Sequence, residues 1–339
     1  MSSQLNMTNR RVLLTSRPKG VPVADHFTVD ESAVPEIRDG EFLVKTEYWS
    51  IDPAMRGWAN DAPNYIPPVE IGAVMRSFAV GEVVASRNAD YAEGDVVSGM
   101  FGWQRYAVSN GSDVDRKVEE TDLPASLSLG VLGLNGVTAY FGLLDNCEPK
   151  EGETVVVSSA AGAVGSAVGQ IAKIKGCRTV GITGSAEKAA LCTDDLGFDA
   201  AINYREENVS DALRAACPDG IDCYYDNTSG PISDAVMTQL AQGARITICG
   251  TVAITDWDPL PVGPRVHRQL LVARARMQGF VIFDYKPRYG EALAQLASWV
   301  REGKLSRNEH ILEGADAAPG AIQMLYEGKN TGKLLVRVD

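Results

Sequence analysis

The fold of this chain is indicated most clearly by the segment TVVVSSAAGAVGSAVGQIAKIKGCRTVGITGS, residues 154–185. It begins with the apolar run Thr154–Ser158, which predicts a buried strand, and a turn rich in glycine and alanine follows. The spacing of apolar residues over 164–175 then predicts a helix, and Arg178–Thr183 predicts a second strand. A strand, a glycine-rich turn, a helix and another strand in this order indicate the first part of a doubly wound parallel sheet, the Rossmann fold.

The turn has the pattern of a dinucleotide-binding site, G-x-G-x-x-G, with alanine at the first position. Ala160, Gly162 and Gly165 fill the three fixed positions, and Ala163 and Val164 lie between the last two. Glycine at 162 lets bare backbone approach a pyrophosphate, and glycine at 165 lets the helix pack closely on the strand. We therefore predict that this turn binds a dinucleotide; a tight turn that binds nothing is the alternative.

The end of the second strand indicates which dinucleotide is bound. NAD-specific sites carry an acidic residue there, which bonds the hydroxyls of the adenosine ribose. This chain has Thr183 and Gly184 instead, with Ser185 and Lys188 close behind. Because no carboxylate would repel an additional phosphate, we predict NADPH or NADP+ as the cofactor. Lys188 alone could equally be a solvated helix residue.

Strands and helices alternate from about residue 127 onward, as expected for a parallel sheet covered by helices. Four further strands are predicted over residues 200–204, 221–227, 245–250 and 277–283. A helix is expected over 291–303, and a last strand over 333–338 should return to the first domain. The strand 277–283 would be the apolar edge of the sheet, which favours pairing with a second copy of the chain.

The residues before about 122 have short alternating runs separated by Gly, Pro and Asp turns, which is typical of a mostly β domain. Residues 41–50 and 78–86 are examples, and the prolines between 53 and 68 predict a loop. The predicted class is therefore α/β with two domains. The substrate domain covers residues 1–127 and is completed by 305–339, and the Rossmann domain covers 128–304.

Composition excludes several kinds of partner. The net charge is −12 for 339 residues, with a pI near 4.9, so binding to nucleic acid or to an anionic membrane is not expected. The N-terminus lacks a signal-peptide core, and the six cysteines form no CxxC pair. We expect a cytoplasmic protein with reduced thiols whose partner is a small molecule.

Five stretches together carry a family resemblance over nearly the whole chain: IDPAMRGWANDAPNYIPPVEIGAVM (51–75), LGLNGVTAYFGL (132–143), SSAAGAVGSAVGQIAKIKGC (158–177), RMQGFVIFDY (276–285) and YEGKNTGKLLVRV (326–338). The sequence resembles the zinc-independent prostaglandin/alkenal reductases of the medium-chain dehydrogenase/reductase superfamily, which include curcumin-reductase-like members. The resemblance implies a GroES-like fold for the first domain and a homodimer. It also implies that Lys188 and Tyr204 hold the adenosine phosphate, that Gly250 borders the cofactor, and that Asn330 lies against the nicotinamide.

The chain departs from this family at two tyrosines. Ala54 stands where the family usually has tyrosine in DPYMR, and Thr255 stands where its lid carries another. These changes leave the substrate and the proton donor open. We expect Tyr65 to donate a hydrogen bond to the substrate carbonyl; a backbone amide or the ribose hydroxyl of the cofactor are alternatives.

Catalytic zinc is not expected. Zinc alcohol dehydrogenases of the superfamily need a Cys and a His in the first domain, which here holds no cysteine. His26, His267 and His310 are scattered. Without a metal to polarise an alcohol, the cofactor is best matched to a carbon–carbon double bond conjugated to a carbonyl. A quinone reductase and a non-catalytic NADPH-binding protein are the alternatives.

Overall fold

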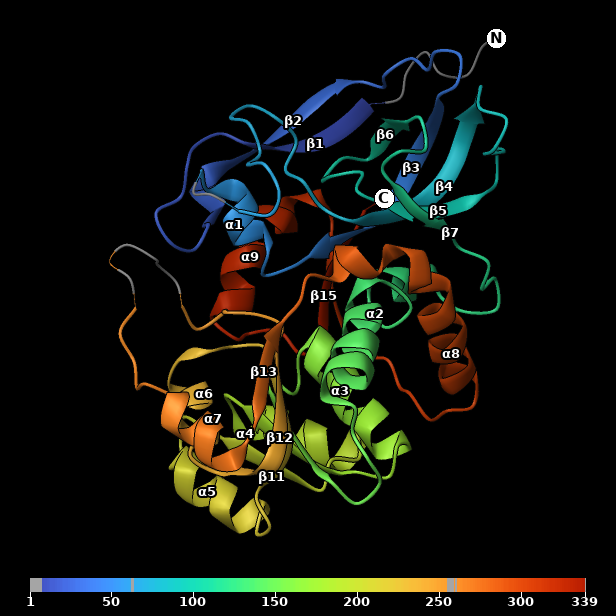
Figure 1. Cartoon of the computed structure of the whole chain (residues 1–339). Helices are drawn as coiled ribbons and strands as arrows, with labels where there is room; N and C mark the ends of the chain where they lie inside the picture. Colours follow the sequence, from blue (N-terminus) through green and yellow to red (C-terminus); the bar gives the residue numbers. More distant parts are fainter. Residues whose placement is uncertain (1–7, 62–63, 255–258, 260, 339) are drawn as a thin grey trace. The chain divides into compact units, whose positions relative to one another are not determined.

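The chain folds into two units, which a computed structural model describes over residues 8–61, 64–254, 259 and 261–338. The first unit consists of Met1–Leu129 with Glu309–Asp339, and the second consists of Gly130–Asn308. The elements of both are labelled in Figure 1.

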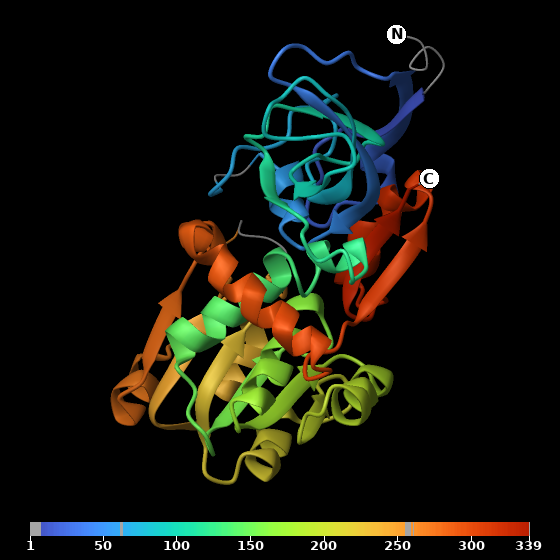
Figure 2. The same cartoon turned by 90° about the vertical axis from the view of Figure 1, so that its right-hand side faces the viewer.

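The second unit is built on a parallel sheet (Figures 1 and 2). Its spatial order is β10-β9-β8-β11-β12-β13, the order of a Rossmann fold. All neighbouring strands pair in parallel. The strands are β8 (Thr154–Ser158), β9 (Arg178–Thr183), β10 (Ala200–Asn203), β11 (Ile221–Asp226), β12 (Leu240–Ile248) and β13 (Arg276–Gly279). The predicted fold class is confirmed.

The last two strands differ from their predicted bounds. β12 begins at Leu240 because it already pairs there with Ile221. It ends at Ile248 because the next two backbone amides, of Cys249 and Gly250, both turn to the carbonyl of Asp226. β13 is the edge strand of the sheet, as predicted. It ends at Gly279 because this residue pairs with Ile248, the last residue of the neighbouring strand β12.

Helices cover both faces of the sheet. On one face α2, α3 and α8 pack together (Figure 2), and α5, α6 and α7 pack against a buried apolar cluster on the other. The predicted helices at 164–175 and 291–303 correspond to α3 and α8. The bounds are α2 (Leu134–Phe141), α3 (Ala163–Ile174), α4 (Ala186–Ala190), α5 (Val209–Ala216), α6 (Gly230–Val236), α7 (His267–Ala273) and α8 (Tyr289–Arg301).

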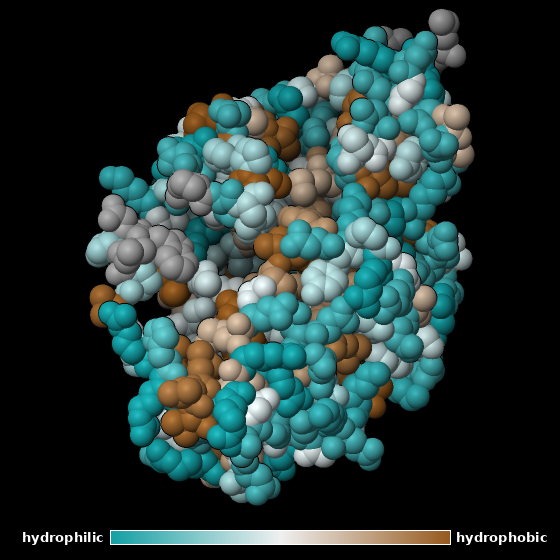
Figure 3. Space-filling model, viewed as in Figure 1, coloured by the Kyte–Doolittle hydropathy of each residue, from teal (hydrophilic) through white to brown (hydrophobic). Residues whose placement is uncertain are grey.

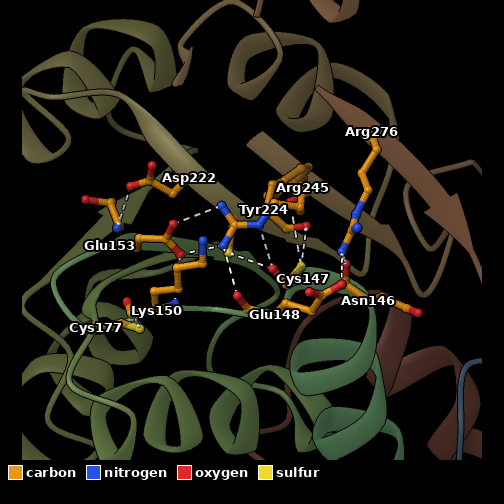
Figure 4. A network of polar contacts seen from close by, with 12 residues as sticks. Asn146, Cys147, Glu148, Lys150, Glu153, Cys177, Asp222, Tyr224, Arg245 and Arg276 are labelled. Carbon is orange, nitrogen blue, oxygen red and sulfur yellow. Dashed lines mark hydrogen bonds and ion pairs between the residues drawn. The ribbon is translucent and has the colours of Figure 1, made fainter. Parts of the chain in front are cut away.

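A polar network fixes the amino ends of the strands (Figure 4). The Arg245 guanidinium bonds the Glu153 carboxylate at 3.0 Å and donates to the Cys147 carbonyl at 2.7 Å, at the end of η3 (Gly142–Cys147). Burial by itself raises the pKa of Glu153, but the bonds from Arg245 and from the Lys150 amide outweigh it and lower the pKa. This network lies at the opposite end of the strands from the glycine turn, so it supports the site without lining it.

The first unit is mostly β, as predicted. Its main sheet has the order β14-β15-β3-β4-β5-β7, with β6 beside β3, and a separate hairpin pairs β1 with β2. The strands are β1 (Thr8–Leu14), β2 (Phe27–Ala33), β3 (Phe42–Ile51), β4 (Ala79–Ser86), β5 (Val96–Gly99), β6 (Tyr106–Ser109), β7 (Val114–Lys117), β14 (Glu309–Glu313) and β15 (Lys333–Arg337). The final strand β15 pairs with β3, so the end of the chain returns to its beginning.

Two helices of the first unit border its sheet, α1 (Met55–Ala59) and α9 (Ala318–Tyr326). The sequence predicted only a loop where α1 lies, which is wrong. Met55, Trp58 and Ala59 are buried, so the apolar residues at i, i+3 and i+4 favour a helical turn despite the flanking prolines. None of the helices in the described ranges is long and apolar enough to cross a membrane.

Candidate functional site

The carboxyl ends of the parallel strands are where an open α/β sheet binds its ligand. The chain runs outward from β8 through β9 to β10 and then returns to β11 on the other side of β8. A crevice is therefore expected between the segments that follow β8 and β11. Gly162, Gly184, Tyr204 and Gly250, four of the predicted cofactor residues, each follow one of the strands at this edge.

The glycine turn after β8 has the close packing that the motif requires. A Cβ atom on Gly165 would lie 2.2 Å from the Ser159 carbonyl oxygen, so no larger residue fits between α3 and the strand end. Gly162 caps the amino end of α3, where a Cβ would lie 3.1 Å from the same oxygen. Ala163 and Val164 form the first turn of the helix, and Ala160 is fully buried. The backbone amides at this helix end are thus placed to bind a pyrophosphate.

A second group of residues gathers after β9 and β10. A Cβ on Gly184 would lie 2.9 Å from the Tyr204 hydroxyl, so these two positions are in contact. Ser185 caps α4 by accepting a hydrogen bond from the Lys188 amide at 3.2 Å. The Lys188 side chain is half-buried; burial and then the nearby Arg205 guanidinium lower its pKa. A phosphate dianion would offset the repulsion between the two cations.

Sequence reasoning missed Arg205. Its guanidinium carbon lies 5.9 Å from the centre of the Tyr204 ring, and in the part of the chain that the structure describes no carboxylate pairs with it. The available signal was a basic residue directly after Tyr204. It was overlooked because an arginine that follows a strand is usually solvated.

The third group joins the carboxyl ends of β8, β11 and β12. The Asn227 amide donates to the Ser158 hydroxyl at 2.9 Å, and its side chain donates to the Ser158 carbonyl at 2.8 Å. A Cβ on Gly250 would lie 2.8 Å from the Asn227 carbonyl oxygen. The sheet thus requires glycine at 250, which leaves bare backbone at this border of the crevice.

Two of the predicted site residues lie in the first unit. Tyr65 is in the loop after α1 and is 57% exposed. Asn330 is buried, and its side-chain amide donates to the Gly332 carbonyl at 2.9 Å. Ala54 precedes α1. Tyr326, another residue that sequence reasoning missed, donates its hydroxyl to the Pro53 carbonyl at 2.9 Å. A second phenol therefore lies beside the alanine that replaces the family tyrosine. Thr255 is outside the described residues.

A buried ion pair holds the segment around Pro53 to the end of the chain. The Lys333 ammonium bonds Asp52 at 2.5 Å and also donates to the Ser50 hydroxyl at 2.6 Å and the Ile51 carbonyl at 3.1 Å. The Lys333 side chain is only 3% exposed. This contact fixes the segment that precedes Ala54 and α1.

No group of three or more His, Cys, Asp or Glu residues that could hold a metal ion occurs among the residues with described coordinates.

Residues 10–116 match the family "N-terminal domain of oxidoreductase", and residues 163–298 match the family "Zinc-binding dehydrogenase". The protein YfmJ of Bacillus subtilis (strain 168) is 46% identical, with 98% of this chain and 99% of that protein covered. The NADPH-dependent curcumin reductase of Escherichia coli (strain K12) is 45% identical, with coverages of 99% and 98%.

A solved structure has closely the same fold as this chain. CurA from Vibrio vulnificus in complex with NADPH matches with a TM-score of 0.91 and 43% identity, covering 97% of this chain and 99% of that chain. The sequence identity to these proteins spans almost their full length, so it covers both units of this chain. The chain therefore belongs to the zinc-independent prostaglandin/alkenal reductase family of the medium-chain dehydrogenase/reductase superfamily.

Proposed function

We propose that this protein is an NADPH-dependent reductase of the carbon–carbon double bond in α,β-unsaturated ketones and aldehydes. The observation that carries the proposal is the edge of the second unit, where a tight glycine turn and a pair of cations occur together without an acidic residue at 184. Relatives named for the NADPH-dependent reduction of curcumin and for prostaglandin reduction support it.

Each group at the edge of the second unit has a separate task in this proposal. The amides at the start of α3, after Gly162 and around Gly165, bind the pyrophosphate. Lys188, Tyr204 and Arg205, beside Gly184 and Ser185, hold the adenosine phosphate. Gly250 and the end of β11 border the nicotinamide half, to which Asn330 also contributes. The Rossmann domain, residues 128–304, thus binds the cofactor, and residues 1–127 with 305–339 bind the substrate.

The reaction follows from the chemistry of a conjugated carbonyl. When bound, NADPH supplies a hydride to the β-carbon of the substrate. Negative charge then develops on the carbonyl oxygen, so a hydrogen-bond donor aimed at that oxygen lowers the barrier, and the α-carbon is finally protonated. The chain's own contribution is to orient the substrate, exclude water and supply that donor.

Tyr65 is the proposed donor, because its phenol is exposed on the loop that follows α1. Tyr65→Phe should lower kcat about tenfold to a hundredfold while changing the KM for NADPH little, since only a donor to the substrate is lost. Steady-state kinetics with an enone would measure this. If Tyr65→Phe keeps full activity and Tyr326→Phe loses it, the phenol beside Ala54 is the donor. If both stay active, the donor is a backbone amide or the ribose hydroxyl.

The proposed reaction is tested by following NADPH consumption with enals, linear enones, cyclic enones and quinones side by side. We expect the highest kcat/KM among the enals and enones, with loss of the double bond confirmed by mass spectrometry. A preference for quinones would make the protein a quinone reductase. Tight NADPH binding with no acceptor that oxidises it would indicate a non-catalytic binding protein instead.

We propose a homodimer formed through the edge of the sheet. The residues of β13 are exposed, and Leu271 and Val272 of the neighbouring α7 are 76% and 60% exposed; Figure 3 shows apolar side chains gathered over α7. An edge strand leaves a row of backbone amides and carbonyls unpaired, and together with the exposed apolar residues of α7 it invites pairing across a two-fold axis. Light scattering should give twice 36.3 kDa, and Met277→Lys should shift the protein toward the monomer. Wild-type particles of 36.3 kDa at micromolar concentration would contradict the dimer.

The proposed location is the cytoplasm. All six cysteines are free, and burial raises the pKa of the Cys177 thiol to about 11 and that of Cys192 to about 12. Such thiols stay protonated at neutral pH and act as small apolar side chains, which suits a reducing compartment.

A further inference from the structure

Ser229, in the turn between β11 and α6, has a backbone conformation that is essentially restricted to glycine. Its φ is 57° and its ψ is −161°. For a residue with a side chain this conformation is strained, and it persists only where several contacts of the surrounding structure hold it in place. Such strain is common where a protein positions a ligand.

Asp226 holds this strained turn in place. Its carboxylate is fully buried, and one oxygen accepts hydrogen bonds from the Ser229 amide at 2.7 Å and the Thr228 amide at 3.0 Å. The Tyr224 hydroxyl donates to the same oxygen at 3.0 Å. The turn is therefore fixed by buried bonds that do not involve the side chain of Ser229.

The side chain of Ser229 must then have a different use, because glycine would adopt this conformation without strain. Its hydroxyl donates to the Gly250 carbonyl at 3.3 Å. A second bond joins the same two segments, from the Ala253 amide to the Thr228 carbonyl at 3.0 Å. The hydroxyl thus joins the segment after β11 to the segment after β12, at the carboxyl edge of the sheet where the cofactor is expected.

We infer that Ser229 is a positioning residue for the nicotinamide half of the cofactor, and that its hydroxyl fixes residues 250–254 against the turn 226–230. The inference rests on the proposed binding of NADPH at this edge. The strain at Ser229 is retained because only a side chain, which glycine lacks, can make the bond to Gly250.

Two substitutions separate this role from a merely structural one. Ser229→Ala removes the hydroxyl and keeps the strain, whereas Ser229→Gly removes both. We expect the Kd for NADPH, measured by cofactor fluorescence, to rise about threefold to tenfold in both variants, as for the loss of one neutral hydrogen bond. The change in Tm should separate the two variants. The Tm of Ser229→Gly should equal or exceed that of the wild type, whereas the Tm of Ser229→Ala should be lower than that of the wild type. Thr238→Ala is the control. It also removes a hydroxyl that donates to a backbone carbonyl, that of Ala235, but Thr238 lies just beyond the end of α6.

The outcomes are distinguishable. Unchanged NADPH binding in Ser229→Gly and Ser229→Ala, or weakening only in the variant with the lower Tm, would overturn the inference. If the wild type binds NADPH and reduces no enone, while both variants bind it more weakly, the proposed reaction fails and the positioning role stands. If the wild type does not bind NADPH, both fail.

Discussion

Lys188→Ala should raise the KM for NADPH about tenfold to a hundredfold and leave the KM for NADH nearly unchanged. The reason is that a half-buried ammonium meeting a phosphate forms a charge-assisted bond worth about 1.5–3 kcal/mol. The adenosine phosphate is distant from the reacting carbon of NADPH, so kcat at saturating cofactor should change little. Initial rates with both cofactors over a concentration series would give these constants.

Three further variants sharpen this test. Tyr204→Phe should act in the same direction but more weakly, because a neutral hydroxyl is the poorer partner. Arg205→Ala should resemble Lys188→Ala if both cations meet the phosphate. Lys173→Ala is the matched control, since its ammonium pairs with Asp199 at 2.9 Å on the same domain. Equal use of NADH and NADPH by the wild type, or equal weakening of both by Lys188→Ala, would contradict the assignment.

Lys333→Met should destabilise the first unit by about 3–5 kcal/mol, because it leaves the Asp52 carboxylate partly buried without its cation. The Ser50 hydroxyl and Ile51 carbonyl lose their donor at the same time. For a domain of this size the Tm should fall by roughly 10 °C, measured by calorimetry.

The controls for Lys333→Met lie on the same chain. Lys329→Met, four residues earlier, removes an exposed ammonium whose partner Glu327 is also at the surface, and should cost less than about 1 kcal/mol. Asp52→Asn combined with Lys333→Met should recover part of the lost stability, since no uncompensated charge is left. A Lys333→Met protein as stable as the Lys329→Met protein would show that the buried pair contributes nothing.

Much of the second unit could be predicted from local sequence. β8 and β9 have the predicted bounds. β8 is fully buried and is a short apolar run between turn residues, and β9 is buried in all its residues after Arg178. The requirement for glycine at 165 was also predictable, since the motif encodes the close contact of α3 with Ser159. The ends of β12 and β13 were not, because a strand ends where its neighbour stops pairing.

Other parts of the site depend on contacts between residues distant in the sequence. Arg205 becomes part of the candidate phosphate site only because β10 lies beside β9, which brings it near Lys188. Tyr326 lies beside Ala54, and Lys333 reaches Asp52, only because β15 pairs with β3. The strain at Ser229 is not visible in the sequence DNTSG, because it arises from the buried bonds of Asp226.

Local sequence was thus sufficient for the Rossmann order of the second unit, the glycine turn and the absence of an acidic residue at 184. These features depend on residue type and short spacing, which are local properties of the chain. The three-dimensional fold was needed to show which cations and phenols share a site and which backbone is strained. Those properties arise when the parallel sheet and the returning strand β15 bring distant residues within hydrogen-bonding distance.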